Sequence, residues 1–516
     1  MPTYTAPGVY VEEVPSSQKS LSAAPTAIAA FVGFTEKAPT DDPKDPEGLA
    51  PRLVTSWSQF EALYGGFVEG AVLPLSVYGY FANGGSIAYI VRIPNTAPAG
   101  APSKVALPAS DRALGLPVQI ESVEPDANIS IAVASDDSDE ASFTLTVLEG
   151  GIEVESYPGV SLSGDSSVAT ATKSSTKIKV TVDLAKDVDL SSQLELLKPG
   201  IYPLAKAAPL PVPVTGKQFS GSESARNGIN GLAVADDVTI VVIPDLITAA
   251  TKDDGSVDLN LWKAVQTALI SHCEQNGNRM AILDAPPGFS VQQIKEWRSD
   301  VAMYDSAYAA LYYPWIKVEN PTGSNGNAEI FVPPSGHIAG VWARTDDTRG
   351  VWKAPANDTI RGVLDIERGV TQNEQSLLNP IGINCIRPFG TRGIRIWGAR
   401  TLASDSDWRY INVRRLFNMI ETTILEGTQY AVFEPNDVDL WEGVKRTLSG
   451  FLRGLWSAGA LVGASPEQAF YVKCDAETNP PESIDEGKLV VEVGISPVKP
   501  AEFVIFRISQ QKQTAA

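Results

Sequence analysis

The 516-residue chain contains only three cysteines and two histidines, and neither residue type has metal-ligand spacing. Cys273, Cys385 and Cys474 lie far apart and are odd in number, so we expect three buried thiols. His272 and Cys273 are neighbours on a predicted helix, where their side chains diverge by about 100° and cannot form a catalytic pair. His337 follows Gly336, and we expect it to be structural. The sequence therefore predicts no metal site.

Basic residues and long apolar runs are also scarce. Lysine and arginine number 41 against 61 aspartate and glutamate, a net charge of −20, which argues against nucleic-acid binding. There is no uninterrupted apolar run of transmembrane length, roughly 18 residues, and no signal peptide. We expect no membrane insertion and a protein that is made and kept in the bacterial cytoplasm during assembly.

The motifs of the common α/β enzymes are missing. There is no phosphate-binding G-x-x-x-x-G-K-[ST] loop, no G-x-G-x-x-G before a helix and no G-x-S-x-G elbow. Asp245 and Asp284 do end predicted parallel strands, where α/β active sites often lie. Two isolated acidic loop residues are more typical of helix caps than of catalysis. We therefore predict no catalytic residue and no cofactor.

Alternating strand and helix patterns predict an α/β middle domain from residues 21–96 plus 226–360. Strands are expected at Val238–Ile243, Met280–Leu283 and Tyr308–Ile316, with helices at Asp258–Glu274 and Val291–Val301 between them. Strands at Ala27–Phe34 and Ile87–Ile93 should join this sheet. Helices are expected at 56–64 and 74–82, and a helix or tight turn at Pro333–Trp342. The fold class is α/β (α+β), with a mixed-sheet core.

Composition changes between residues 97 and 225. This stretch has 17 acidic and 9 basic residues, only four aromatic residues and no tryptophan. Alternating runs at Phe143–Leu148 and Lys177–Val182 indicate β-strands. We interpret residues 97–225 as an inserted, acidic, β-rich outer domain.

Residues 361–487 are predicted to form a C-terminal α/β domain. Strands are expected at Ile383–Ile386 and Ile394–Trp397 around the turn Phe389–Gly393. Further strands are expected at Tyr430–Phe433 and Ala469–Cys474. One helix should begin at Ser404–Asp407 and run to about Glu426; a second should begin at Asn436–Asp439 and end near Gly459 or Gly463.

Both termini carry apolar strand patterns beside prolines. Residues 1–20 form an extended arm with Val9, Tyr10, Val11 and Val14. Residues 488–516 contain the alternating set Leu489, Val491, Val493 and Ile495, followed by a last strand with Phe503, Val504, Ile505, Phe506 and Ile508. These segments are either ordinary edge strands or strands donated to a neighbouring subunit, and we predict strand exchange between subunits.

The arginines are concentrated in one stretch. From Arg387 to Arg415 there are seven arginines against Asp405 and Asp407, a net charge of +5 in an acidic protein. They either form internal ion pairs or present an electropositive surface to an acidic partner. On the second C-terminal helix, Arg446 and Arg453 fall opposite the apolar face.

Several strings together resemble the contractile tail sheath family of phage tails and phage-tail-like contractile injection systems. They are YTAPGVYVEEV at the N-terminus and RGIRIWGARTL, WRYINVRRL, FEPND, LWEGVKR, FLRGLW, AFYVKCD and GISPVKPAEFVIF toward the C-terminus. The resemblance implies a structural subunit that polymerises helically and contracts. Its expected partners are further copies of itself, an inner tube, a baseplate and a terminal cap protein.

The resemblance also implies that the C-terminal domain lies innermost, against the tube. The tube-facing candidates are Arg409, Arg414, Arg415, Lys445, Arg446 and Arg453. A metabolic α/β enzyme would need a cofactor motif or catalytic constellation, which we do not find. A surface-layer or adhesin protein would normally carry an export signal, and we see none.

Overall fold

The computed structural model describes residues 21–39, 42, 44–45, 47–94, 104–107, 118–123, 129–135, 142–182, 199–204, 214–322 and 328–507. The chain divides into two compact units, one of residues 94–213 and one of the remainder. We call the first the insert. Within the second we distinguish the body, built on one large sheet, from a C-terminal layer of residues 411–507.

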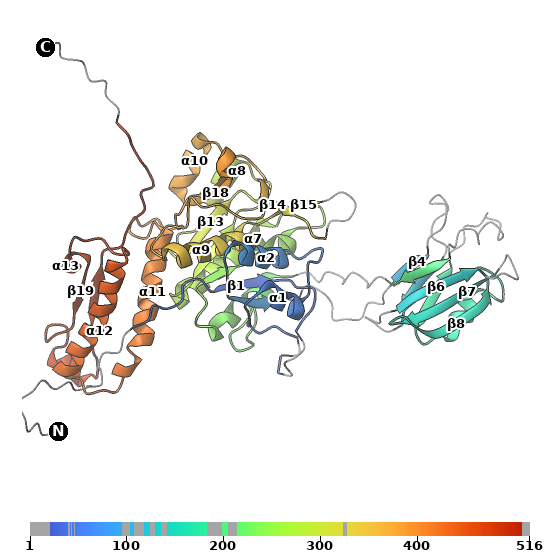
Figure 1. Cartoon of the computed structure of the whole chain (residues 1–516), viewed down its shortest axis with the longest axis horizontal. Helices are drawn as coiled ribbons and strands as arrows, with labels where there is room; N and C mark the ends of the chain where they lie inside the picture. The colour runs from blue at the N-terminus through green and yellow to red at the C-terminus, as the bar shows by residue number, and fades with distance from the viewer. Residues whose placement is uncertain are drawn as a thin grey trace, which may run out of the picture. The chain divides into compact units, whose positions relative to one another are not determined.

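An eight-stranded sheet in the order β18-β17-β13-β12-β11-β1-β3-β2 forms the centre of the body (Figure 1). Its six inner strands run parallel, and the two edge strands are antiparallel. The strands are β1 (Ala29–Gly33), β2 (Arg52–Val54), β3 (Ala88–Arg92), β11 (Ile240–Val242), β12 (Met280–Asp284), β13 (Ala309–Tyr313), β17 (Ile383–Pro388) and β18 (Ile394–Trp397). The predicted mixed α/β fold is confirmed.

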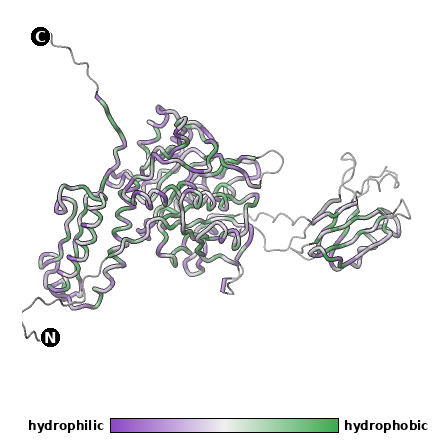
Figure 2. The backbone as a smooth tube through the Cα atoms, in the orientation of Figure 1, coloured by the Kyte–Doolittle hydropathy of each residue, from purple (hydrophilic) through white to green (hydrophobic). Residues whose placement is uncertain are grey.

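Helices cover both faces of this sheet, so its inner strands are apolar on both sides. One core cluster joins the sheet to α7 (Leu259–Asn276) and α8 (Val291–Glu296). The other joins it to α1 (Trp57–Tyr64), α2 (Leu73–Asn83) and α9 (Ser335–Arg349). Hydrophobic residues accordingly concentrate in the central strands (Figure 2).

Helices α2 and α9 approach each other closely because small residues line their contact. A Cβ atom on Gly340 would lie 2.4 Å from the backbone oxygen of Tyr80, and one on Gly79 would overlap the His337 ring. His337 is thus a buried packing residue, as predicted.

Two predicted segments of the body differ in the structure. The single strand expected at Tyr308–Ile316 is split at Pro314, which has no N–H to continue a ladder. Its second part, β14 (Ile316–Glu319), pairs instead with β15 (Glu329–Val332) and β16 (Val363–Ile366). The strands β17 and β18 were predicted as part of the C-terminal domain, but β17 pairs with β13 and completes the body sheet.

The C-terminal layer contains two long helices and an antiparallel pair of strands, which we call the hairpin although residues 474–491 separate its strands in the sequence. Helix α11 (Ile411–Gly427) and helix α12 (Val438–Ser457) share an apolar cluster with β19 (Phe470–Lys473) and β20 (Glu492–Ile495). The predicted cap of the second helix is confirmed, because the Asp437 side chain accepts a hydrogen bond from the Leu440 N–H.

Three local predictions in this layer are wrong. Helix α11 begins after Tyr410 rather than at Ser404–Asp407, because Ser404 is bonded to the Asp305 carboxylate instead. The strand expected at Tyr430–Phe433 is replaced by a 3₁₀ turn, Gln429–Ala431, followed by exposed residues. The strand expected to include Leu489 and Val491 begins only at Glu492. The backbone N–H and C=O groups of Val490 form hydrogen bonds with the side chain of Asn479 instead of with a neighbouring strand.

The insert has a core of its own. One sheet contains β10 (Gly200–Pro203), β6 (Ile129–Ser135), β7 (Phe143–Glu149) and β8 (Ile152–Val160); the other contains β4 (Lys104–Leu107), β5 (Val118–Ser122) and β9 (Ile178–Val182). Inward side chains of both sheets form one cluster that includes Phe143, Leu145 and Ile120. The β-strands predicted for this stretch are therefore present. The predicted range ran to residue 225, but residues 214–225 belong to the other unit, where Phe219 is fully buried.

The insert is attached at two points that lie in one cluster of the body. Ile93 and Val214, which flank the insert in the sequence, both belong to that cluster. We predict that replacing residues 94–213 by a short Gly/Ser linker leaves the body folded, since neither of its core clusters loses a member. Near-ultraviolet circular dichroism and a cooperative thermal transition would report this. A deletion variant without a cooperative transition would show that the body depends on the insert.

Candidate assembly interface

The carboxylates considered as catalytic candidates serve as helix caps. Asp245 follows β11 and accepts hydrogen bonds from the backbone N–H groups of Phe34, Val72 and Leu73, the last two at the start of α2. Asp284 accepts one from Ser335 N at 2.9 Å, at the start of α9. Burial raises the pKa of each carboxyl to about 7. Each acid satisfies helix-end donors that would otherwise be orphaned.

The cysteines and His272 have structural surroundings. All three thiols are buried and unpaired, and burial raises the pKa of Cys273 and Cys385 to about 12, which disfavours the reactive thiolate. His272 Nε2 lies 3.1 Å from a guanidinium nitrogen of the buried Arg279. Among the described residues no group of three metal-ligating side chains converges, and none of the helices there is long and apolar enough to cross a membrane.

Arg415 was predicted as a tube-facing candidate, but its side chain is 4% exposed. It forms a two-pronged ion pair with Asp346 of α9, with N–O distances of 2.9 and 2.5 Å, and lies over the Trp342 ring. It also donates to the backbone oxygen of Thr26, just before β1. This is the internal ion pair that the sequence analysis left as the alternative.

Arg414 is also buried, so the tube-facing assignment is wrong for both arginines. Its guanidinium lies 4.3 Å from the centre of the Trp408 ring and donates to Asn418 and Glu421. The reason is that α11 is packed on more than one side. Its apolar stripe enters the core of the C-terminal layer, while its polar side contacts the body.

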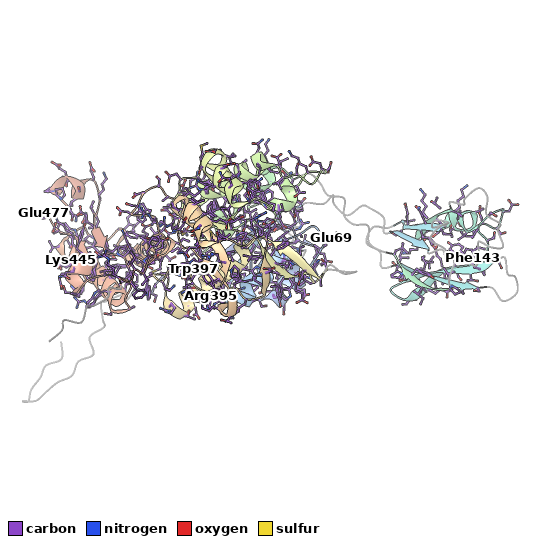
Figure 3. All side chains as sticks on the ribbon, turned by 90° about the horizontal axis from the view of Figure 1, so that it is seen from above. Glu69, Phe143, Arg395, Trp397, Lys445 and Glu477 are labelled. Carbon is purple, nitrogen blue, oxygen red and sulfur yellow. The ribbon has the colours of Figure 1, made fainter. Side chains whose placement is uncertain are left out.

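The remaining tube-facing candidates are accessible. Arg409 is exposed just before α11, and Arg446 and Arg453 are exposed on α12. Lys445, labelled in Figure 3, is partly exposed and lies 3.4 Å from Glu442. These four side chains stay candidates for contact with a partner.

Among the described strands, β19 and β20 pair only with each other. Phe470 and Val493 turn toward α12, while Tyr471 on the opposite face is 58% exposed. No third strand pairs with this hairpin within the part of the chain that the structure describes. Free strand edges of this kind present unsatisfied N–H and C=O groups and invite pairing with another chain.

An exposed apolar run follows the hairpin. Phe503, Val504, Ile505 and Phe506 are between 69% and 83% exposed, and residues 503–507 pair with no strand that the structure describes, so the expected last strand is not part of this subunit's described sheets. The predicted arm residues Val9, Tyr10, Val11 and Val14, and Ile508, lie outside the described residues. A soluble protein rarely leaves such a run uncovered.

Immediately before this run, Glu502 is held by three side chains. Arg400 donates two hydrogen bonds to it, at 2.9 and 2.6 Å, and Asn379 and Tyr410 add one each. This group was not among the residues predicted from the sequence. The surplus of arginines around Arg400 was its only visible signal, because the carboxylate partner lies about a hundred residues further on.

Comparison with known proteins matches two family models, described as the phage tail sheath protein central domain (residues 235–402) and the phage tail sheath C-terminal domain (residues 403–511). Together they cover more than half of the chain. Their common boundary falls between β18 and α11, where the body gives way to the C-terminal layer.

Two relatives illustrate the range of similarity. A prophage major tail sheath protein of Pseudomonas aeruginosa is 26% identical over 389 residues, which cover 72% of this chain and 96% of that protein. The tail sheath protein of Enterobacteria phage T4 is 27% identical over 241 residues, 44% of this chain and 35% of the T4 protein. This chain thus spans about a third of the longer phage relative.

Two solved structures match along the whole chain. The sheath complex of an extracellular contractile injection system, PVC, in its contracted state has a TM-score of 0.58 at 26% identity, covering all of both chains. The contracted helical sheath of the anti-feeding prophage has a TM-score of 0.59 at 25% identity, covering 99% of this chain and all of that one.

The buried arginine generates a stability prediction. We expect Arg415→Gln to lower the free energy of unfolding by about 3–5 kcal/mol, because Asp346 is left buried without its cation. Arg446→Gln on the exposed face of α12 is the matched control and should change it by less than about 0.5 kcal/mol. Urea unfolding measures both. Equal, small effects would show that the Arg415 pair does not hold the layer to the body.

Proposed function

The chain belongs to the contractile phage tail sheath family, and we propose that copies of it polymerise helically around an inner tube and then contract, driving the tube through a target envelope. The observation that carries this is the presence, among the described residues of one subunit, of a β19–β20 hairpin without a third strand and of an exposed apolar segment at residues 503–506. The edge of the hairpin on one copy can accept the apolar terminal segment of a neighbouring copy as an additional strand. A head-to-tail contact of this kind generates a helix when its rotation does not close a ring.

The proposed link is an added strand. Residues 503–508 of one copy, and residues 9–14 of another, would pair with the edges of the hairpin. Backbone hydrogen bonds would supply the attachment, and alternate apolar side chains its register. The proposed receiving strand is β20, which contains Val493 and is preceded by Leu489 and Val491. A link of this kind keeps its hydrogen bonds while the rigid bodies rotate relative to each other.

The proposed tube contact is the outer face of α12. Arg446 and Arg453 are exposed there and Lys445 partly so, with Arg409 as a further candidate. Exposed cations on an otherwise acidic protein favour an acidic partner and raise the rate of association.

Other partners follow from the relatives. One solved chain, similar at 26% identity with a TM-score of 0.56, comes from the baseplate of the anti-feeding prophage, and we propose that this sheath also ends on a baseplate and on a terminal cap. Assembly in the bacterial cytoplasm belongs to the same proposal. The extended sheath would be a kinetically trapped state whose contraction releases interface free energy without nucleotide hydrolysis.

Removing the terminal segments tests the strand link. We predict that a chain ending at Pro500, or one lacking residues 1–14, stays folded but no longer polymerises. Each missing backbone hydrogen bond weakens every link by about 0.5–1.5 kcal/mol. Circular dichroism reports the fold and sedimentation the assembly. Full-length sheaths from the truncated chains would contradict the strand link, and loss of the fold would make the segments ordinary core strands.

Charge reversal on α12 tests the tube contact. We expect the double variant Arg446→Glu, Arg453→Glu to polymerise alone but to co-assemble poorly with the tube protein, because repulsion replaces attraction at the contact. The control is Lys295→Glu, which reverses a partly exposed charge in the body helix α8. Co-sedimentation with purified tube protein measures the effect. Undiminished co-assembly of the double variant would remove α12 as the tube contact.

A further inference from the structure

The two terminal segments leave the folded unit at opposite ends of one helix, α11. At its beginning, the hydroxyl of Tyr410, which precedes the first residue of α11, donates to Glu502 at 3.2 Å. Two residues into the helix, the side chain of Asn412 donates to the backbone oxygen of Val498 at 3.0 Å. The chain toward the C-terminus is therefore tied to the first turn of α11.

The chain from the N-terminus is tied to the last turns of the same helix. The backbone N–H of Ala24 donates to Thr423 Oγ1 at 2.9 Å, and Thr423 in turn donates to the backbone oxygen of Met419. Leu21 lies directly against Gly427, where an added Cβ would meet its side chain at 2.1 Å. The first described residues thus follow the end of α11.

The tie at Glu502 is stronger than a surface ion pair. The side chains of Arg400 and Glu502 are 12% and 19% exposed, and four hydrogen bonds converge on the one carboxylate. Partial burial opposes its charge, but these hydrogen bonds and the Arg400 guanidinium hold the pKa of Glu502 below its ordinary value. The next residue, Phe503, is already 73% exposed. Glu502 is therefore the last point, among the residues that the structure describes, at which the body holds the chain.

Helix α11 itself cannot shift freely. Arg415 fixes its first half to Asp346 of α9, and the same guanidinium bonds to Thr26 O. Between Tyr410 and Thr423 the helical rise of 1.5 Å per residue gives a separation of roughly 20 Å. A packed helix keeps that spacing while its surroundings move.

We propose that α11 is a crossbar that sets the distance and direction at which the two terminal segments leave the subunit, with Glu502 and Thr423 as the positioning residues at its two ends. The consequence for assembly rests on the function proposed above. If both segments are donated to neighbours, the span between two links of the polymer is set inside each subunit by one helix. Rotation of the bodies on contraction would leave that span unchanged.

Distance measurement between spin labels tests this in the free subunit. Labels on Ser22→Cys, which is exposed near the N-terminal tie, and on Phe503→Cys, just beyond the C-terminal tie, report the separation by pulsed electron resonance. The three native cysteines are buried and need no replacement. We expect a single narrow distance distribution for the otherwise unchanged protein, kept dilute.

Breaking one tie should remove the narrow distribution without unfolding the protein. Glu502→Gln keeps the size of the side chain but loses the charge that Arg400 binds, so we expect the distribution to broaden. Thr423→Val should act similarly at the other end, and Thr423→Ser should restore the narrow form. The control is Glu477→Gln, an exposed carboxylate of the same layer that is labelled in Figure 3. Near-ultraviolet circular dichroism confirms that each variant is folded.

A distribution that stays narrow in Glu502→Gln and Thr423→Val would overturn the crossbar, and so would a broad distribution in the unaltered labelled chain. Both results are independent of polymerisation. A chain that shows the expected distances but never forms sheaths would instead contradict the proposed function and leave the crossbar standing. In sheaths formed by Glu502→Gln we expect irregular helical order.

Discussion

The buried ion pair between Arg415 and Asp346 is the contact on which the arrangement of the C-terminal layer depends. It joins α11 to α9 of the body, and through Thr26 it also holds the chain that enters β1. A pair this deeply buried gains from its two parallel hydrogen bonds and from the Trp342 ring, but it tolerates the loss of neither partner. The layer that carries α12 and the hairpin therefore takes its position from the body rather than from loose surface contacts.

The subunit combines cores that can fold without a neighbouring copy with strand edges and apolar residues that remain exposed in the described structure. The body sheet is covered on both faces, and the insert has its own apolar cluster, so neither requires a neighbour to fold. The hairpin and the terminal apolar run are different: within the described residues the hairpin has no third strand, and Phe503 to Phe506 are largely exposed. In the strand link proposed above, folding and assembly therefore draw on separate parts of the molecule. This separation suits a polymer whose rigid subunits must rotate without unfolding.

The sequence predicted what local patterns encode. The alternation of strands and helices, the Asp437 cap and the β-rich nature of the insert were all readable from periodicity and cap chemistry. The prediction that Arg414 and Arg415 are exposed was wrong. An amphipathic pattern shows that one side of α11 is polar, but it does not show whether that side faces solvent or packs against the body. The role of Glu502 and the pairing of β17 with β13 were also not predicted, since both depend on contacts between residues distant in sequence. The family resemblance was based on short sequence motifs, which carry no information on residue contacts and therefore could not show which arginines are buried.

The central claim is that copies of this chain link by adding strands to the β19–β20 hairpin. Electron cryo-microscopy of filaments formed by the purified full-length chain tests it most directly, because the backbone of every strand at the hairpin can be traced to its own subunit. We predict helical tubes in which at least one strand from a neighbouring copy pairs with an edge of the hairpin. Tubes in which the hairpin keeps only its own two strands would contradict it, as would a small, compact, monodisperse particle under all conditions.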